Sequence, residues 1–425
     1  MSWSVRYAIK SYLLSTVWTA PVVALLLEQI TFRVAYSYHV DFGGIPGFVI
    51  GREGTIELAD YVISSSIAFI VFTFSSLIVA IQVASGQLTP RIIATALLRD
   101  RGIRASVALF VYSLLLAIAV KTRIDTIPRF LASLTGILGL LSVIVFMFLI
   151  DHAARLLRPV NVVWRIAQEG LRVISDVYPS PITTEAEPVQ SSLELEPTIR
   201  TVLHREPSAI VIAVNVAALI AAAMKADIII ELVPRVGDFV ARDDPLFRLR
   251  GSGARAVNQR FLRGQIAFGR ERTIEQDSTF ALRVIVDVAI KALSSAINDP
   301  TTAVIAIDQL QRLLGAVGKR DLRDEKVCDR DGKLRLIFHT PNWNDFVELS
   351  FSEIRMYGAG NFQVVRRLRS MIENLSQTLA ARRVLPLRQE LELLDRTLEK
   401  TYVFPEDLAR ARVPDSQGLG GASSS

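Results

Sequence analysis

Apolar and amphipathic patterns divide the chain into two parts. Before residue 151 lie four apolar segments, each close to the roughly 20 residues that a helix needs to cross the ~30 Å hydrocarbon core of a bilayer. They cover residues 11–30, 61–83, 103–120 and 130–150. Further along, the apolar segments are shorter, lie between charged residues and follow helical or strand periods. The pattern predicts a transmembrane domain at residues 1–160, a membrane α-helical bundle of four transmembrane helices, followed by an α+β cytoplasmic domain.

The first apolar segment has the outward form of a secretory signal peptide, because Arg6 and Lys10 precede it. It continues past Pro21 to Ile30 without a small-residue cleavage pattern. We therefore predict a retained helix that is kinked at Pro21, where the backbone amide hydrogen is missing. Glu28 then falls near the far end of this helix.

Lysine and arginine are concentrated on one side of the predicted bundle. Positive residues in short flanking segments are retained on the cytoplasmic side of a membrane. The residues on that side are Arg6, Lys10, Arg91, Arg99, Arg101, Arg104, Arg155, Arg158 and Arg165. The opposing loops are poorer in Lys and Arg, although not empty. The asymmetry predicts a multi-pass protein of the cell membrane with both termini in the cytoplasm.

Polar side chains recur along the second predicted helix. At 100° per residue one narrow face collects Ser64, Ser75, Gln82 and Thr89, with Ser85 at its margin. A second group falls roughly opposite and consists of Ser65, Thr73, Ser76 and Gln87. We therefore expect this helix at the centre of the bundle. Two interpretations stay open: the polar residues form hydrogen bonds between packed helices, or the first face lines a hydrated path.

The chain after residue 160 divides into four predicted regions. They are a helical linker at 161–207, a small β-containing module at 208–250, an α+β cytoplasmic domain at 251–405 and a disordered tail at 406–425. Within the module we expect strands at 210–214, 228–233 and 246–249, a helix at 217–225 and a turn at Gly237. Beyond it we expect strands within 333–353 and helices at 362–381 and 386–401.

Residues 270–314 have a helical apolar rhythm that is interrupted at Asn298, Asp299 and Pro300. An aspartate followed by proline is a strong helix-start signal, because the carboxylate accepts from an unpaired amide and proline has none to satisfy. The first interpretation is therefore a helix cap. The second is a polar cluster that binds a ligand or another subunit, made of Arg270, Arg272, Gln276, Asp277, Asn298 and Asp299.

Composition narrows the classes of binding partner that we expect. The 425 residues are 51% hydrophobic with a net charge of +6, and basic residues interleave with acidic ones. Without a nucleic-acid recognition module, this balance favours the lipid bilayer and its anionic headgroups as partners and disfavours nucleic acid. The single cysteine, Cys328, excludes an internal disulfide, and the four histidines lie far apart. We predict no bound metal.

Motifs for catalysis and cofactors are missing from the sequence. It contains no HExxH, GxSxG or GxxxxGK pattern, so we expect no enzyme activity. The segment VPRVGDFVARDDPLFRL resembles the turn of lipoyl-like and barrel-sandwich-hybrid domains, but no lysine stands at a hairpin tip to carry a cofactor. We therefore expect no cofactor.

Three blocks together carry a resemblance to a known family. They are FSSLIVAIQVASGQLTPR, GDFVARDDPL and ALSSAINDPTTA. Their order and spacing resemble the bacterial predicted membrane protein family named domain of unknown function 2254, over nearly the whole chain. The resemblance implies a four-helix membrane region with a cytoplasmic domain, and it implies no activity.

Two classes of function follow from these patterns. The first is an oligomeric ion channel or transporter with a cytoplasmic regulatory domain, because four helices are few for a path within one chain. A homo-oligomer would place the polar face of the second helix near the symmetry axis. The alternative is a membrane-anchored sensor or scaffold without transport activity.

Overall fold

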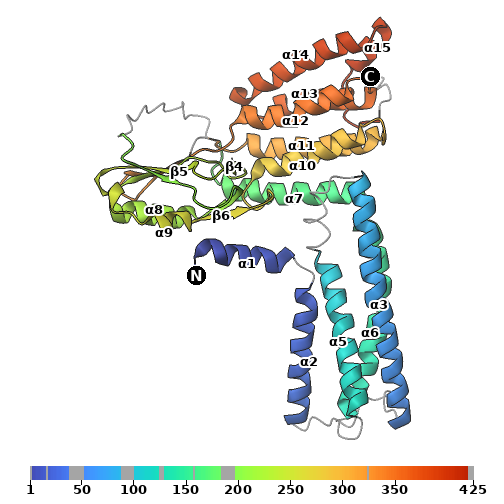
Figure 1. The fold of residues 1–425 in the computed structure, drawn as a ribbon. Helices are drawn as coiled ribbons and strands as arrows, with labels where there is room; N and C mark the ends of the chain where they lie inside the picture. The colour runs from blue at the N-terminus through green and yellow to red at the C-terminus, as the bar shows by residue number, and fades with distance from the viewer. Residues whose placement is uncertain are drawn as a thin grey trace. The chain divides into compact units, whose positions relative to one another are not determined.

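The computed structural model describes residues 2–15, 18–37, 52–87, 100–123, 129–156, 158–182, 197–322 and 325–419. The chain forms two compact units. We refer to Ser11–Val162 as the membrane unit, and to Met1–Lys10 together with Val163–Ser425 as the soluble unit. The helix α1 (Trp3–Ser15) crosses the boundary between the two units (Figure 1).

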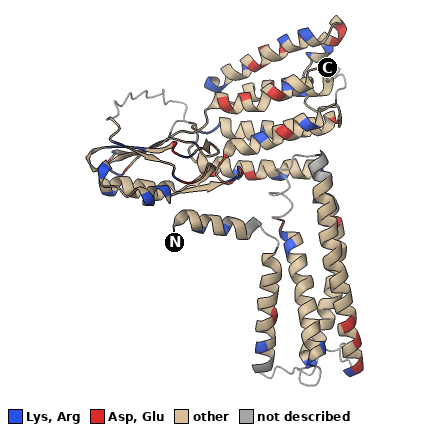
Figure 2. Ribbon diagram, in the orientation of Figure 1, with Lys and Arg blue, Asp and Glu red and all other residues tan. Residues whose placement is uncertain are grey.

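The membrane unit is built from long apolar helices. They are α2 (Thr19–Ser37), α3 (Arg52–Gln87), α5 (Arg101–Thr122) and α6 (Arg129–Leu156). Among the described helices, three are long and apolar enough to cross a membrane, and these are α3, α5 and α6. Figure 2 shows these helices as long uncharged stretches with charged residues mostly toward their ends. The chain is therefore mostly helical, with three candidate membrane spans among its described helices.

The first predicted span differs from the structure. One helix ends at Ser15 and α2 begins at Thr19, so residues 11–30 do not form one continuous helix with a kink. Pro21 lies in the first turn of α2, where a missing amide hydrogen costs no hydrogen bond. Because α2 continues to Ser37, beyond the predicted end at residue 30, Glu28 lies at its middle and not near its end.

The centre of the membrane unit is α5, whereas the polar pattern of the sequence predicts α3 for this place. The helix α5 packs against α2, α3 and α6, because its small and apolar residues point in several directions. Leu116 and Val120 belong to one cluster with residues of α2 and α6, and Ala117 packs with Ala59 and Val62 of α3 in another. The α3–α5 contact also includes an aromatic pair whose ring centroids lie 5.4 Å apart.

The soluble unit contains two sheets. Their strands are β1 (Arg200–Leu203), β2 (Ala209–Val214), β3 (Ile229–Leu232), β4 (Phe239–Val240), β5 (Pro245–Arg250), β6 (Ile266–Gly269), β7 (Glu325–Cys328) and β8 (Leu334–Phe338). A five-stranded sheet has the order β1-β5-β3-β8-β7, and a three-stranded sheet has the order β4-β2-β6. The parallel pair of β3 and β8 joins the predicted module at 208–250 to the following region in one sheet.

Helices make up the rest of the soluble unit. They are α7 (Pro159–Val177, from Val163 onward), α8 (Val216–Ala226), α9 (Gln259–Arg263), α10 (Ser278–Ala292), α11 (Pro300–Gly318), α12 (Trp343–Gly358), α13 (Phe362–Thr378), α14 (Val384–Thr401) and α15 (Pro405–Ala411), with short 3₁₀ turns at Ser252–Arg255 and Ala381–Arg383. In Figure 1 the helices α10 to α14 stack in successive layers beside the strands. Val286, Leu310 and Phe351 are among the fully buried residues of this stack.

Sequence periodicity predicted β2, β3, β5, β8, α8, α10, α11, α13 and α14, and it missed β1, β4, β6, β7 and α9. Three further differences have a local explanation. Residues after Pro341 form α12 and not a strand, because Asn342 and Asp345 form a capping box. The predicted disordered tail contains α15, and Asp415 is buried where its amide donates to the backbone carbonyl of α13. The predicted linker includes α7, whose Gly170 lies directly against α10 and is part of the core.

The N-terminal helix packs onto the three-stranded sheet. Trp3 and Tyr7, one helical turn apart, cover a buried cluster of that sheet, which consists of Ile212, Ala213 and Ala267. The Ser4 amide donates to Gly264 O at 3.2 Å, and the Tyr7 hydroxyl donates to a carboxylate oxygen of Glu275. Residues 2–10 are therefore a structural part of the soluble unit, although the membrane helices follow them in the sequence.

Candidate functional site

The predicted polar face lies on the outside of α3. Ser64, Ser75 and Gln82 are all exposed, so no other described helix of the same chain covers them. The side chain of Ser85 and the whole of Thr89 fall outside the described residues. Three of the five predicted pore-lining residues therefore share an uncovered face, over roughly 27 Å of helix at 1.5 Å per residue.

Large apolar side chains separate these polar groups. Val71 is 59% exposed and Ile78 is 57% exposed, and at 100° per residue both fall within about 40° of the Ser64 direction. The outer face of α3 thus alternates between polar and apolar positions along its length. The predicted polar residues share one face but do not form a continuous polar stripe.

The second polar group of α3 points toward the other helices of the bundle. Thr73 is buried, and its Oγ1 donates to Phe69 O at 2.6 Å within its own helix. Ser76 is half-buried. Between the neighbouring helices, Ser113 Oγ of α5 lies 3.2 Å from Ser142 Oγ of α6. These inner hydroxyls match the packing interpretation, because Thr73, Ser113 and Ser142 satisfy their polarity inside the bundle.

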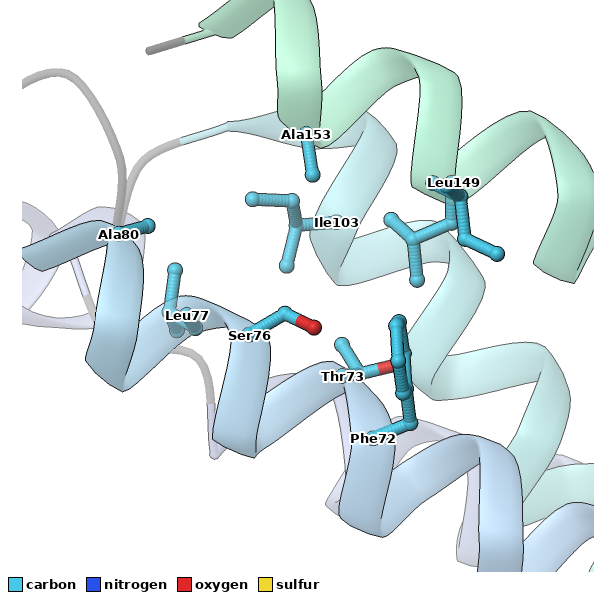
Figure 3. A pocket seen from close by; sticks show the side chains of 9 residues that line it. Phe72, Thr73, Ser76, Leu77, Ala80, Ile103, Leu149 and Ala153 are labelled. Atoms are coloured by element: carbon cyan, nitrogen blue, oxygen red, sulfur yellow. The ribbon is translucent and has the colours of Figure 1, made fainter.

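A cavity of about 100 Å³ opens between α3, α5 and α6. Figure 3 shows its lining, in which Thr73 and Ser76 supply the hydroxyl groups and all the other side chains are apolar. The lining residues are Phe72, Thr73, Ser76, Leu77, Ala80, Ile103, Leu149, Ile150 and Ala153. These positions lie where α5 begins and where α3 and α6 approach their ends.

Charged groups inside the membrane unit were not predicted as site residues. Asp100 caps α5 by accepting from Ile103 N, and its carboxylate lies 2.8 Å from His152 Nε2 of α6. The sequence signal for this contact was an aspartate immediately before an apolar run. Glu28 is 5% exposed at the middle of α2, where Gln29 Nε2 donates to it at 2.9 Å. Ionisable residues inside membrane segments are rare, and each is a candidate for a functional site.

Part of the predicted polar cluster of the soluble unit comes together next to Gly237. Asp277 caps α10 by accepting from two backbone amides of its first turn, and Arg272 Nε donates to its other oxygen at 3.1 Å. Gln276 Oε1 accepts from Val214 N of β2 at 2.9 Å. These contacts fix the start of α10 against the three-stranded sheet. The polar groups thus form structural hydrogen bonds.

The other members of the cluster lie elsewhere. Asp299 caps α11, as predicted, by accepting from Thr302 N at 3.1 Å. Its own amide donates to Ala292 O, at the opposite end of α10 from Asp277. Between these ends α10 has 15 residues, which is roughly 22 Å. Asn298 adopts a left-handed conformation with φ of 48°, and Arg270 is exposed. The six residues therefore do not form a single site.

A second cavity, of about 610 Å³, lies between α12 and α14. On its wall Arg355 Nε and Glu390 Oε2 are 3.7 Å apart, which is too long for a hydrogen bond. Burial raises the pKa of Glu390, although Arg355 acts in the opposite direction. Within the described part of the chain no three His, Cys, Asp or Glu residues are grouped so that they could hold a metal ion.

Comparison with known proteins identifies relatives of this chain. The model of the family described as Predicted membrane protein (DUF2254) matches residues 10–374. Uncharacterized protein Mb1321c of Mycobacterium bovis and Uncharacterized protein Rv1290c of Mycobacterium tuberculosis are each 26% identical over 428 residues, which cover 95% of this chain and 80% of the relative. No solved structure matches the chain.

Proposed function

Because the chain belongs to this family of predicted membrane proteins, we propose that it is an oligomeric ion channel or transporter in which α3 lines the path. The soluble unit would act as its regulatory domain. One observation carries the proposal: uncharged polar side chains at Ser64, Ser75 and Gln82 are left uncovered on one face of a membrane-spanning helix.

Lipid is an unfavourable neighbour for such a face. A hydroxyl or amide without a hydrogen-bond partner in hydrocarbon costs roughly 2–7 kcal/mol, and Gln82 carries both a donor and an acceptor. A second copy of α3, or water between several copies, would satisfy these groups. Closed symmetry is the usual arrangement of such assemblies.

The apolar positions on the same face give the path a gate. In a ring of α3 helices, Val71 and Ile78 would form constrictions between the polar levels of Ser64, Ser75 and Gln82. Narrow apolar constrictions dewet and so block ions without a physical plug. The closed state of the proposed channel therefore needs no further element.

We also propose that α2 is a fourth span and that both termini face the cytoplasm. Residues 2–10 and 163–425 belong to one unit, which favours an even number of bilayer crossings between them. The helices α3, α5 and α6 supply three candidate crossings. Among the described helices between residues 10 and 163, α2 is the further apolar one, and at 19 residues it reaches roughly 28 Å.

The exposed side chains of α2 support this assignment. Its uncovered residues include Val22, Val23, Leu25, Leu26, Leu27, Ile30 and Val34. Arginines flank the side of the bundle on which the soluble unit continues from α6, which favours the cytoplasm for that side. Reporter fusions after Ile182 and within residues 41–51 should lie on opposite sides of the membrane, and finding both on one side would contradict four spans.

Flux through reconstituted protein tests the channel proposal. We expect protein-dependent leakage of monovalent ions from liposomes, reduced in Gln82→Leu, which adds an apolar constriction. Val71→Ser should raise the leakage, because it wets the gate. Ile144→Ser is the matched control, since Ile144 is 65% exposed on α6, and it should leave the rate unchanged.

The alternative is a sensor or scaffold that transports nothing. It predicts no leakage for the native chain or for Val71→Ser under any voltage or pH, together with normal assembly of all variants. In either case we propose a non-enzymatic protein whose partners are the bilayer, anionic headgroups and further copies of itself, and which does not bind nucleic acid.

A further inference from the structure

The residues that line the cavity of Figure 3 lie toward one end of the helices α3, α5 and α6. Along α3 its lining extends from Phe72 to Ala80, which is about 12 Å at 1.5 Å per residue. It begins beside Ile103, in the first turn of α5. The ~30 Å hydrocarbon core contains two leaflets, so the residues that line the cavity span most of the depth of one leaflet.

The lining is mostly apolar, and its two hydroxyl groups provide few hydrogen-bond partners for water. Thr73 Oγ1 already donates to Phe69 O, which leaves Ser76 as the other hydroxyl of the lining. A water molecule needs two to four polar partners to be held in a cavity, and apolar cavities of similar size stay dry and accept small apolar molecules. The expected occupant is therefore hydrocarbon.

The rim of the cavity is continuous with the surface that faces lipid. Phe72 is 45% exposed and Ile150 is 41% exposed although both line the cavity. Near them on the same helices, Val79 and Met147 are 56% and 59% exposed. An acyl chain can therefore enter from the bilayer without passing a polar barrier.

Positive charge is available at the same end of the bundle. Arg101 stands two residues before Ile103, and Arg155 stands two residues after Ala153 of the cavity wall. Both arginines are exposed. Arg155 also pairs with Asp151, so Arg101 is the guanidinium of these two that is more available to a phosphate. Headgroup phosphates lie at the depth of such flanking residues.

We propose that this cavity is a binding site for one acyl chain of an anionic phospholipid, whose headgroup phosphate contacts Arg101. The bound chain fills the gap between α3 and the pair of α5 and α6, and it supports the packing of the three helices. The site needs only a membrane-inserted chain, so it exists whether or not the chain forms oligomers or conducts ions.

Thermal unfolding of the full-length protein in detergent, with added phosphatidylglycerol or phosphatidylcholine, tests this site. We expect phosphatidylglycerol to raise the melting temperature in a saturable way and phosphatidylcholine to raise it less. Ala153→Leu should fill the cavity, stabilise the lipid-free protein and abolish most of the lipid-dependent increase. Ala154→Leu is the matched control, because Ala154 is exposed and does not line the cavity.

Two further variants keep the test decisive. Ala80→Leu fills the cavity from α3, so a folding failure of Ala153→Leu does not end the experiment. Arg101→Gln should raise the half-saturating phosphatidylglycerol concentration by up to about fivefold, the upper end of the range for one exposed ion pair, without changing the lipid-free melting temperature. The proposal is overturned if both filled variants keep the full lipid response, or if the two lipids act equally.

Discussion

Replacing Asp299 with alanine should weaken the soluble unit by roughly 2 kcal/mol, the sum of a lost helix cap and a lost side-chain partner. The carboxylate accepts from Thr302 N at 3.1 Å and from Thr302 Oγ1 at 2.5 Å. Loss of an N-cap costs about 1 kcal/mol. Thr302 is 9% exposed, so its hydroxyl loses a partner where water has little access, which adds about 1 kcal/mol.

The full-length chain is the right material for this measurement. A fragment of residues 208–401 would lack β1, which pairs with β5, and α7, whose Gly170 contacts the α10 and α11 helices. Urea unfolding in detergent, followed by tryptophan fluorescence, should show a lower midpoint with an unchanged slope. For a domain of this size the melting temperature should fall by roughly 4–8 °C.

A matched variant separates capping from other roles of this side chain. Asparagine caps a helix as well as aspartate does, so Asp299→Asn should stay within about 0.5 kcal/mol of the native protein. Equal losses in Asp299→Ala and Asp299→Asn would refute the capping argument and point to a need for charge. Native stability in both variants, with loss of a bound small molecule, would revive the ligand-cluster interpretation.

Three further changes test other contacts. Gly237→Ala should cost at least about 2 kcal/mol in urea unfolding, because φ is +94° and the new Cβ would lie 2.7 Å from Arg272 Nε; native stability would contradict this. Burial acts to raise the pKa of Glu231, but hydrogen bonds from its two arginine partners outweigh it and lower the pKa below 4.5. The ionised carboxylate therefore stabilises the folded state above pH 4.5, and this stabilisation is lost as the pH falls through the lower folded pKa. Glu231→Gln should accordingly flatten the acid side of a plot of unfolding free energy against pH, and an unchanged acid side would refute this. His152→Ala should lower the melting temperature by removing the ring that lies 2.8 Å from the Asp100 carboxylate, with partial rescue by His152→Gln.

Local signals in the sequence predicted the elements that depend on neighbouring residues alone. The Asp299 and Pro300 pair marked the start of α11, and the mostly β-branched run at 210–214 marked β2. Apolar length marked α3, α5 and α6. In each case the determinant is a cap, a side-chain period or a span length, and none of these requires a distant part of the chain.

Other features depended on tertiary contacts that no local pattern contains. Residues 406–419 of the glycine and serine rich tail are ordered because Gly418 packs on Val304 and Gln363 donates to Gly418 O. The predicted polar cluster is divided because its two halves lie at opposite ends of α10. The 15 residues of this helix keep them apart. The direction of Ser64 was predictable from angles, whereas its exposure depended on where α5 and α6 pack.

The docking of α1 gives the soluble unit two covalent connections to the membrane unit. One runs from Lys10 into α2 and the other from Val162 into the rest of α7. A ligand that binds the soluble unit can shift the membrane helices between two states only if it binds those states with different affinities. The packing of Trp3 and Tyr7 on the three-stranded sheet is a contact that such states would strengthen or weaken. If the proposed channel is regulated through α1, this contact must differ in strength between a conducting and a closed state, whereas a scaffold would hold it constant.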